Sequence, residues 1–110
     1  MLDAVGQGLA RYMDLLSARQ KLVAGNIANA DTPGYRTRDI DFQSEFASAL
    51  NRATVSAIEV PGLTTKNDGN NVSLDRESRL LAENALRFNI VSTLLKSQVR
   101  ALRTAIQDGR

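Results

Sequence analysis

Residues 73–108 read SLDRESRLLAENALRFNIVSTLLKSQVRALRTAIQD, and this stretch decides the fold. Its apolar residues recur in alternating steps of four and three, which is typical of the heptad pattern of a helix that packs on other helices. Ser73 can cap the start of the helix, acidic residues follow in the first turn, and Gly109 can end it. A helix of this length would be about 50 Å long. We call the following apolar positions the C-terminal seam: Leu81, Ala85, Phe88, Leu95, Val99, Leu102 and Ile106.

A second amphipathic helix is predicted at the other end of the chain, over about residues 2–30. Apolar residues again recur in steps of three and four from Leu2 onwards. The helix should end near Pro33-Gly34, because the residue before a proline avoids the helical region and Pro-Gly marks a turn.

The middle of the chain, about residues 31–72, is predicted to be irregular. It holds Pro61-Gly62 and the turn-forming run at residues 67–71, NDGNN. A short helix over about 41–52 is indicated by Phe42 and Phe46, which lie four residues apart. We therefore expect an all-α fold in which residues 1–110 form a single domain. Its two long terminal helices should pack as an antiparallel hairpin or coiled coil.

The composition argues against several classes of protein. The 110 residues contain no Cys and no His, which removes the commonest general base, the thiol nucleophile and the usual metal ligands. We expect no enzyme activity, no catalytic residue, no metal site and no cofactor. A net charge of +2 favours no nucleic-acid partner. No stretch approaches the roughly 20 apolar residues of a membrane span, and no cleavable signal peptide is recognisable at the start.

Residues 25–42 read GNIANADTPGYRTRDIDF, and this segment resembles the N-terminal signature of the flagellar rod and hook protein family. The continuation at residues 38–42, RDIDF, looks like the proximal-rod branch, as do residues 67–72, 74–77 and 81–86. In this sequence the signature residues expected at an interface are Asn26, Ile27, Ala28, Asn29, Thr32, Pro33, Gly34 and Tyr35.

The resemblance implies a structural subunit of the proximal rod of the bacterial flagellar basal body, located in the periplasmic rod. Such subunits leave the cytoplasm through the flagellar type III export gate without a cleaved signal peptide, and assemble through their terminal helices into a helical rod. Implied partners are further copies of the chain, FlgC-type and other rod proteins, the adaptor FliE and the membrane-ring base. Phe42 and Phe46 fit the pattern by which the export gate recognises early rod subunits, and Leu2–Val5 is a similar candidate.

The same residues also allow simpler, purely structural interpretations. The signature could be only a helix end, and the two phenylalanines could be only a core stripe. Asp39 and Asp41 could serve acid–base chemistry or bind a cation, but Arg36 and Arg38 beside them favour a solvated or inter-subunit salt-bridge patch. The alternative function is a generic helical-hairpin adaptor that binds one partner helix.

Overall fold

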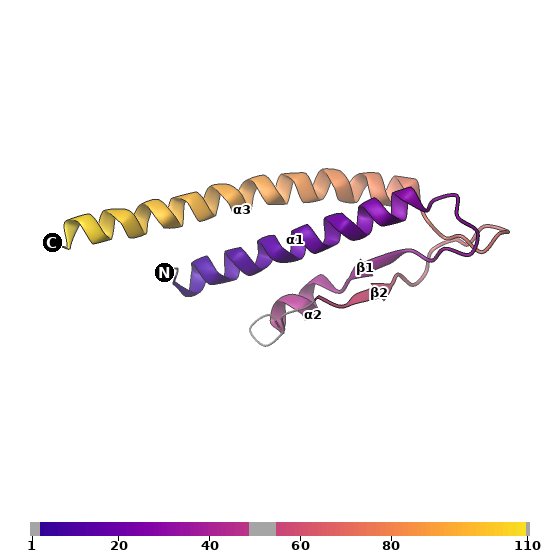
Figure 1. Ribbon diagram of the computed structural model, residues 1–110, viewed down its shortest axis with the longest axis horizontal. Coiled ribbons are helices and arrows are strands. Elements are labelled where there is room, and N and C mark those ends of the chain that lie inside the picture. The colour runs from indigo at the N-terminus through magenta and orange to yellow at the C-terminus, as the bar shows by residue number, and fades with distance from the viewer. Residues whose placement is uncertain (1–2, 49–54, 110) are drawn as a thin grey trace.

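The computed structural model describes residues 3–48 and 55–109. It is mostly helical, with two long helices and a small two-stranded sheet (Figure 1). The elements in chain order are α1 (Ala4–Ala28), β1 (Arg38–Ile40), α2 (Phe42–Ala47), β2 (Ala57–Glu59) and α3 (Leu74–Asp108). The molecule is elongated, with extents of 68 × 27 × 18 Å. The prediction of a mainly helical chain with a long helix at each end is confirmed.

Local side-chain caps start both long helices. The side chain of Asp3 accepts a hydrogen bond from the Gly6 N–H at 2.8 Å, and Ser73 accepts one from the Arg76 N–H at 3.2 Å. Helix α3 begins one residue after the predicted cap, and Gly109 follows its last residue. Helix α1 ends at Ala28, five residues before Pro33, with Asn29 as its C-cap. Leu2, where the predicted first helix began, lies outside the described residues.

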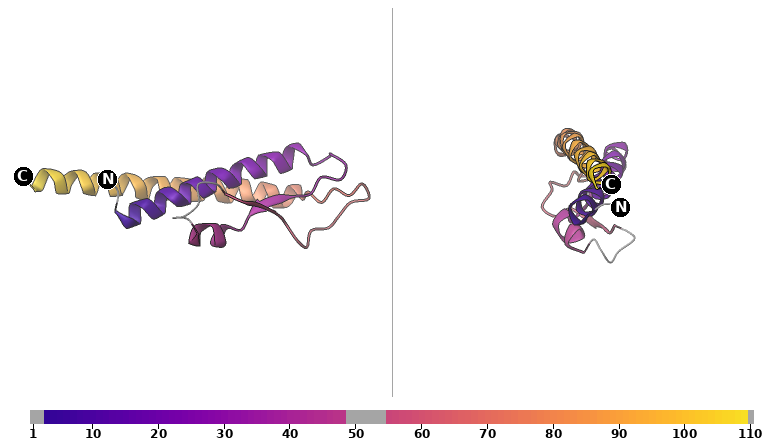
Figure 2. Two further views of the ribbon diagram at one scale, coloured as in Figure 1. Left: turned by 60° about the horizontal axis from the view of Figure 1, so that its bottom comes forward. Right: turned by 90° about the vertical axis from the view of Figure 1, so that its left-hand side faces the viewer.

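Helix α1 is the central element of the fold. It contacts α3 along one side, and β1 and α2 along another. Figures 1 and 2 show that α1 and α3 run in opposite directions along the long axis, while the sheet and α2 lie beside α1. The buried apolar side chains of the described residues are few: Leu15, Leu16, Val23, Ile40 and Val91. The apolar core of the described residues is therefore thin.

The middle of the chain is more regular than the sequence predicted. Strands β1 and β2 pair antiparallel, with Asp39 opposite Ile58, so a small two-stranded sheet accompanies the mainly helical fold that was expected. Three-residue strands are too short for an alternating pattern to identify them. Helix α2 corresponds to the predicted short helix, and Asp41 caps it by accepting from the Ser44 N–H. The predicted continuation of that helix over residues 49–52 lies outside the described residues.

The face of α3 that lies against α1 differs from the C-terminal seam. The buried residues of α3 are Glu77, Asn84 and Val91, at intervals of seven. Within the seam, Leu81 and Leu95 are half-buried, while the other members are exposed: Ala85, Phe88, Val99, Leu102 and Ile106. Most of the seam therefore stays exposed in one chain, although Leu81, Ala85 and Phe88 line a hollow between α3 and α1. The apolar pattern missed this register because Glu77 and Asn84 are polar residues that turn inward.

Helix α3 extends well past the start of α1. In Figure 2 its C-terminal end projects beyond the first residues of α1. Residues 99–109, which we call the α3 overhang, are all exposed. Over residues 3–48 and 55–109, neither long helix carries a stretch apolar enough to cross a membrane.

Candidate assembly site

The side chain of Asn26 connects three elements at the end where α1 stops and α3 begins. Its Nδ2 donates hydrogen bonds to the Arg38 carbonyl oxygen at 2.8 Å and to Oε1 of Glu77. Its Oδ1 accepts from the Arg38 N–H at 3.1 Å and from the Tyr35 hydroxyl at 3.0 Å. Asn26 and Glu77 are both fully buried. A buried amide is tolerated when its hydrogen bonds are made, and here both its donors and its acceptor are used.

A chain of ion pairs continues from Glu77 towards the middle of α1. Nη1 of Arg76 lies 2.7 Å from Oε2 of Glu77, and Nη2 of Arg76 lies 2.7 Å from Oδ2 of Asp39. Arg19 donates to both oxygens of Asp39, at 3.0 and 3.1 Å. We call Arg19, Asn26, Asp39, Arg76 and Glu77 the polar corner. It joins α1, β1 and α3 through side chains that are mostly or wholly buried.

The electrostatic state of Asp39 follows from its surroundings. Burial by itself would raise the pKa of this carboxyl group. The hydrogen bonds from Arg19, the Ile40 N–H and Arg76, together with the charge of Arg19, outweigh burial and hold the pKa of Asp39 below its ordinary value. The carboxylate is thus matched by two guanidinium groups, and it belongs to a buried ion-pair chain. The expectation of a solvated patch with its sequence neighbours is wrong for Asp39, because its side chain turns inward to Arg19 and Arg76.

Asn70 and Asn71 lie in the loop between β2 and α3. They hydrogen-bond to the loop between α1 and β1, at the same end of the molecule as the polar corner. Asn70 donates to the carbonyl oxygens of Asn29 and Thr32, at 2.9 and 2.8 Å. Asn71 accepts from the Thr37 N–H at 2.6 Å. The loops pass closely enough that a Cβ on Gly69 would lie 3.4 Å from the Cα of Gly34. Both loops are therefore held as one unit with the polar corner.

The signature residues separate into two groups. Asn26 is buried, while Ile27, Asn29 and Tyr35 are half-buried among the contacts of this end of the chain. The remaining members are exposed: Ala28, Thr32, Pro33 and Gly34. Gly34 has φ = 76°, a left-handed conformation that favours glycine. The buried and half-buried signature residues contact other parts of their own chain and so contribute to its fold. The exposed signature residues are available to a neighbouring molecule.

Sequence reasoning missed the hydrogen bond between Asn26 and Glu77 and the other buried contacts of this end of the molecule. Asn70 and Asn71 were interpreted as part of a turn, and Glu77 as one of the acidic residues in the first turn of the C-terminal helix. A signal was present, because residues 67–72 and 74–77 also carry the family resemblance. Their role could not be read from spacing, because Asn26 and Glu77 are 51 residues apart.

Phe42 and Phe46 both contact the ring of Tyr12. The centroid distances are 4.9 Å for Phe42 and 6.0 Å for Phe46, with edge-to-face geometry. The guanidinium of Arg19 lies 5.5 Å from the Phe42 ring centroid. Phe42 is half-buried and Phe46 is 43% exposed. In the folded chain the two residues therefore hold α2 against α1.

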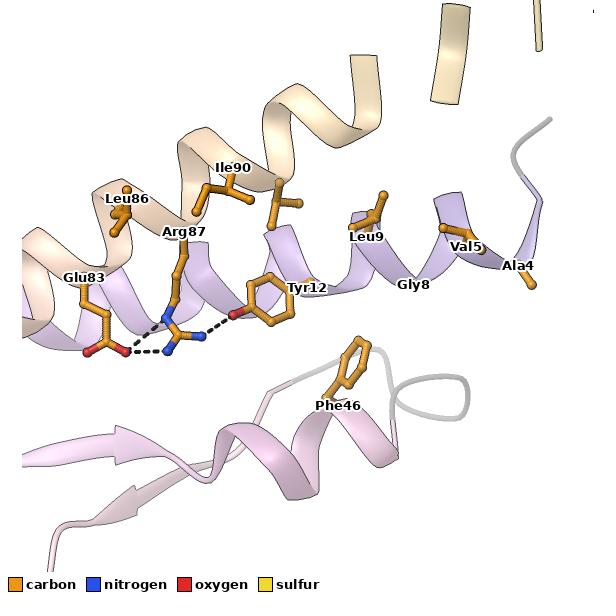
Figure 3. A pocket seen from close by; sticks show the side chains of 11 residues that line it. Ala4, Val5, Gly8, Leu9, Tyr12, Phe46, Glu83, Leu86, Arg87 and Ile90 are labelled. Atoms are coloured by element: carbon orange, nitrogen blue, oxygen red, sulfur yellow. Dashed lines mark hydrogen bonds and ion pairs between the residues drawn. The ribbon is translucent and has the colours of Figure 1, made fainter. Parts of the chain in front are cut away.

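An apolar groove lies between the N-terminal half of α1 and the middle of α3 (Figure 3). Its volume is about 620 Å³, and we call it the α1–α3 groove. Arg87 lies at one end, where it donates to Glu83 at 2.8 Å and to the Tyr12 hydroxyl at 2.6 Å. The lining residues are Ala4, Val5, Gly8, Leu9, Tyr12, Phe46, Glu83, Leu86, Arg87, Ile90 and Val91.

The described residues hold no group of three acidic side chains arranged to bind a metal ion. The site is instead a set of surfaces: the outward signature residues at one end, and the groove and overhang towards the other. Such surfaces suit association with proteins.

Comparison with known proteins identifies similar chains. Residues 13–36 match the family described as "Flagella basal body rod protein". The flagellar basal body rod protein FlgB of Salmonella typhimurium is 32% identical, over 98% of this chain and 96% of that protein. The FlgB proteins of Cereibacter sphaeroides (34% identical, over 89% and 90%) and Yersinia enterocolitica (30%, over 99% and 100%) are also similar. The sequence similarity thus covers nearly the full length of this chain and of each of these relatives.

The polar corner predicts a defined dependence of stability on pH. Because the pKa of Asp39 is lower in the folded chain than in the unfolded chain, its contribution is complete above the ordinary aspartate pKa of about 3.9. It is lost as the pH falls through the lower folded pKa. We expect Asp39→Asn to lower the free energy of unfolding at pH 7, and this deficit to shrink below about pH 4. Urea unfolding of both proteins from pH 7 to pH 3 measures it.

Asp75→Asn is the matched control, because the Asp75 side chain is 85% exposed in its pair with Arg79. Its effect should stay small throughout this pH range. A deficit for Asp39→Asn that is unchanged at pH 3 would contradict the assigned role of the Asp39 carboxylate.

Proposed function

Because this chain belongs to the FlgB family of flagellar basal body rod proteins, and is therefore a structural subunit of the rod, we propose that it assembles through exposed apolar faces of its two terminal helices. Its place is the bacterial flagellar basal body, where it associates with other rod and basal-body components. Its relatives are structural proteins by name, and we propose that it likewise has no enzyme activity.

The observation that carries this proposal is the apolar surface of α3. Large apolar side chains are exposed along the whole helix: Leu74, Leu86, Phe88, Ile90, Leu94, Val99, Leu102 and Ile106. They lie on several sides of the helix, so one partner helix would not cover them all. Extended apolar surface on a soluble chain marks an interaction site. In the rod, neighbouring subunits would cover it, and each terminal helix would form antiparallel coiled-coil-like contacts both within and between chains.

The polar corner supports the proposal that one end of the molecule is held within the chain while the other end is completed by neighbouring subunits. It holds one end of the long helices, so that residues 1–110 act as one rod-type domain with a fixed shape at that end. Neighbours complete the other end, and burial between subunits offsets the entropy lost when the helix is ordered. We propose that Ala28, Thr32, Pro33 and Gly34, which are exposed signature residues, contact the next protein of the basal body. Suitable partners are FlgC-type rod proteins, the adaptor FliE and the membrane-ring base.

Delivery of the chain to the periplasm would use the flagellar type III export gate. Phe42 and Phe46, which share the side of α2 facing Tyr12, are the proposed recognition residues. Their packing in the folded chain means that recognition would take place while α2 is detached from α1. Residues 2–5 are a further candidate, of which Leu2 lies outside the described residues.

Leu102→Asp tests assembly through the overhang. Leu102 is 36% exposed in the single chain, so the new carboxylate is solvated there, but it would be buried without a partner in the rod. We expect a folded protein that is absent from purified hook–basal bodies, with loss of motility. Quantitative mass spectrometry of those particles, with the other rod proteins as reference, measures incorporation.

Thr104→Asp is the control for Leu102→Asp, because it adds the same charge to another side of the same exposed segment. It should be incorporated. Normal incorporation of Leu102→Asp would contradict burial of this face. Absence of the wild-type chain from the particles, with the protein soluble in the cytoplasm, would favour the adaptor function.

Phe42→Ala tests the export proposal. We expect the variant to accumulate in the cytoplasm at normal levels and to be missing from the periplasm, because the gate no longer recognises it. Tyr12→Ala is the control, since it removes the same ring contact but keeps both phenylalanines. Immunoblots of the two cell fractions distinguish the cases. Normal export of Phe42→Ala would show that Phe42 is a packing residue only.

A further inference from the structure

We propose that the free edge of β2 binds an extended segment of a different basal-body protein, which joins the sheet as a third strand. The contact is made by main-chain groups in the middle of the chain, so the apolar faces of α1 and α3 take no part in it. The inference rests on the proposed function, because it adds a second kind of contact by which a rod subunit would be held among its neighbours.

The hydrogen bonds of the sheet fix which main-chain groups of β2 point outward. The Val60 N–H donates to the Thr37 carbonyl oxygen at 3.0 Å, just beyond the three paired residues of each strand. In an antiparallel pair, residues that bond to the partner strand alternate with residues whose N–H and C=O point away from it. Ile58, two residues before Val60, therefore bonds to β1, whereas the main-chain groups of Ala57 and Glu59 point away from β1.

The outer edge of β1 is closed by groups of its own chain. The Arg38 N–H donates to Oδ1 of Asn26 at 3.1 Å, and the Arg38 carbonyl oxygen accepts from Nδ2 of Asn26 at 2.8 Å. The Ile40 N–H donates to Oδ1 of Asp39 at 2.7 Å. The side chains of Asn26 and Asp39 thus occupy the positions where a further strand would pair, so β1 cannot accept one.

The outer edge of β2 is open. Within residues 3–48 and 55–109, neither the N–H nor the C=O of Ala57 or Glu59 has a hydrogen-bond partner. Because β1 lies between α1 and β2, the open edge faces away from the long helices (Figure 1). The two outward residues present their donors and acceptors about 7 Å apart. Unpaired groups of this kind are a template for another strand.

The side chains along β2 also suit an added strand. Natural edge strands are often protected by charged side chains. Glu59, the one charged residue of β2, is already paired with Arg36 at 2.9 Å. Ile58 is 44% exposed, and an added strand would place an apolar or β-branched side chain beside it. Pro61 has no N–H, so the row of outward donors ends at Glu59.

The edge selects both the conformation and the source of its partner. A helix uses its main-chain groups internally, so only an extended segment can pair with alternate residues of β2. Among its described residues, a second copy could offer only its own β2, because both edges of β1 are occupied. Pairing of β2 with β2 is two-fold and closes after two copies, so it cannot continue along a rod. The partner that fits is therefore another protein, with an apolar residue in the middle of the pairing segment.

Hydrogen exchange at single-residue resolution tests the added strand, on the free full-length protein and on isolated hook–basal bodies. Ile58 and Val60 should exchange slowly in both samples, because they donate within the sheet. The amides of Ala57 and Glu59 should exchange fast in the free protein and about tenfold more slowly in the particles. Fast exchange of both amides in particles that contain the chain would overturn the inference and leave the rod function intact. Absence of the wild-type chain from the particles would instead overturn the proposed function.

Ala57→Pro distinguishes strand pairing from simple burial. Proline removes the outward N–H, which β1 does not use, and it is tolerated at such positions of edge strands. Ala57 borders a hollow of about 540 Å³, so the ring has space. In the particles the variant should lose the protection of Glu59, whereas Ala57→Val, which is similar in size and keeps the N–H, should retain it. Equal protection of Glu59 in both variants would overturn strand pairing.

Photo-cross-linking supplies a test that does not depend on the proline variant. Ile58 is replaced by p-benzoyl-phenylalanine, and the full-length protein is irradiated in isolated hook–basal bodies. We expect the cross-link to form within one extended segment of another basal-body protein, next to an apolar residue. A cross-link to a helix, to β2 of a second copy, or to no protein in particles that contain the chain would overturn the inference.

Discussion

The buried amide of Asn26 is the constraint on which the other contacts depend. It hydrogen-bonds to Arg38 in β1, to Tyr35 in the connecting loop and to Glu77 in α3. Without it, the buried Glu77 would lose one of its two partners, and the carbonyl and N–H of Arg38 would lose theirs. A buried polar group left without partners costs about 1–3 kcal/mol, a large share of the stability of a small domain. One side chain thereby fixes how α1, the sheet and α3 meet.

This arrangement places the buried polar contacts at one end of the molecule and the exposed apolar surface towards the other end. Polar contacts hold the corner, where a specific set of partners defines one geometry. Towards the other end the apolar groove lies between α1 and α3, and residues 99–109 are exposed. A subunit that assembles as proposed would use both properties, a defined shape at one end and apolar surface for its neighbours at the other.

The sequence was sufficient to predict the two long helices, because caps, apolar periodicity and turn residues are local signals. It also predicted the family, because the signature at residues 25–42 is specific. It could not predict the β1–β2 pairing or the inward orientation of Glu77 and Asn84. Periodicity assigns polar residues to the surface, whereas these two turn inward to reach Asn26 and Gln20, more than fifty residues away. The signature therefore acts first on the fold of its own chain.

Hydrogen exchange of the free, full-length protein tests the central claim, that the fold is held from the polar corner and left incomplete at the overhang. Mass spectrometry of the exchanged peptides measures protection along each helix. The account predicts the slowest exchange in residues 19–28 of α1 and 77–91 of α3, and fast exchange in residues 99–109. Equal protection of the overhang, or rapid exchange around Asn26 and Glu77, would contradict it.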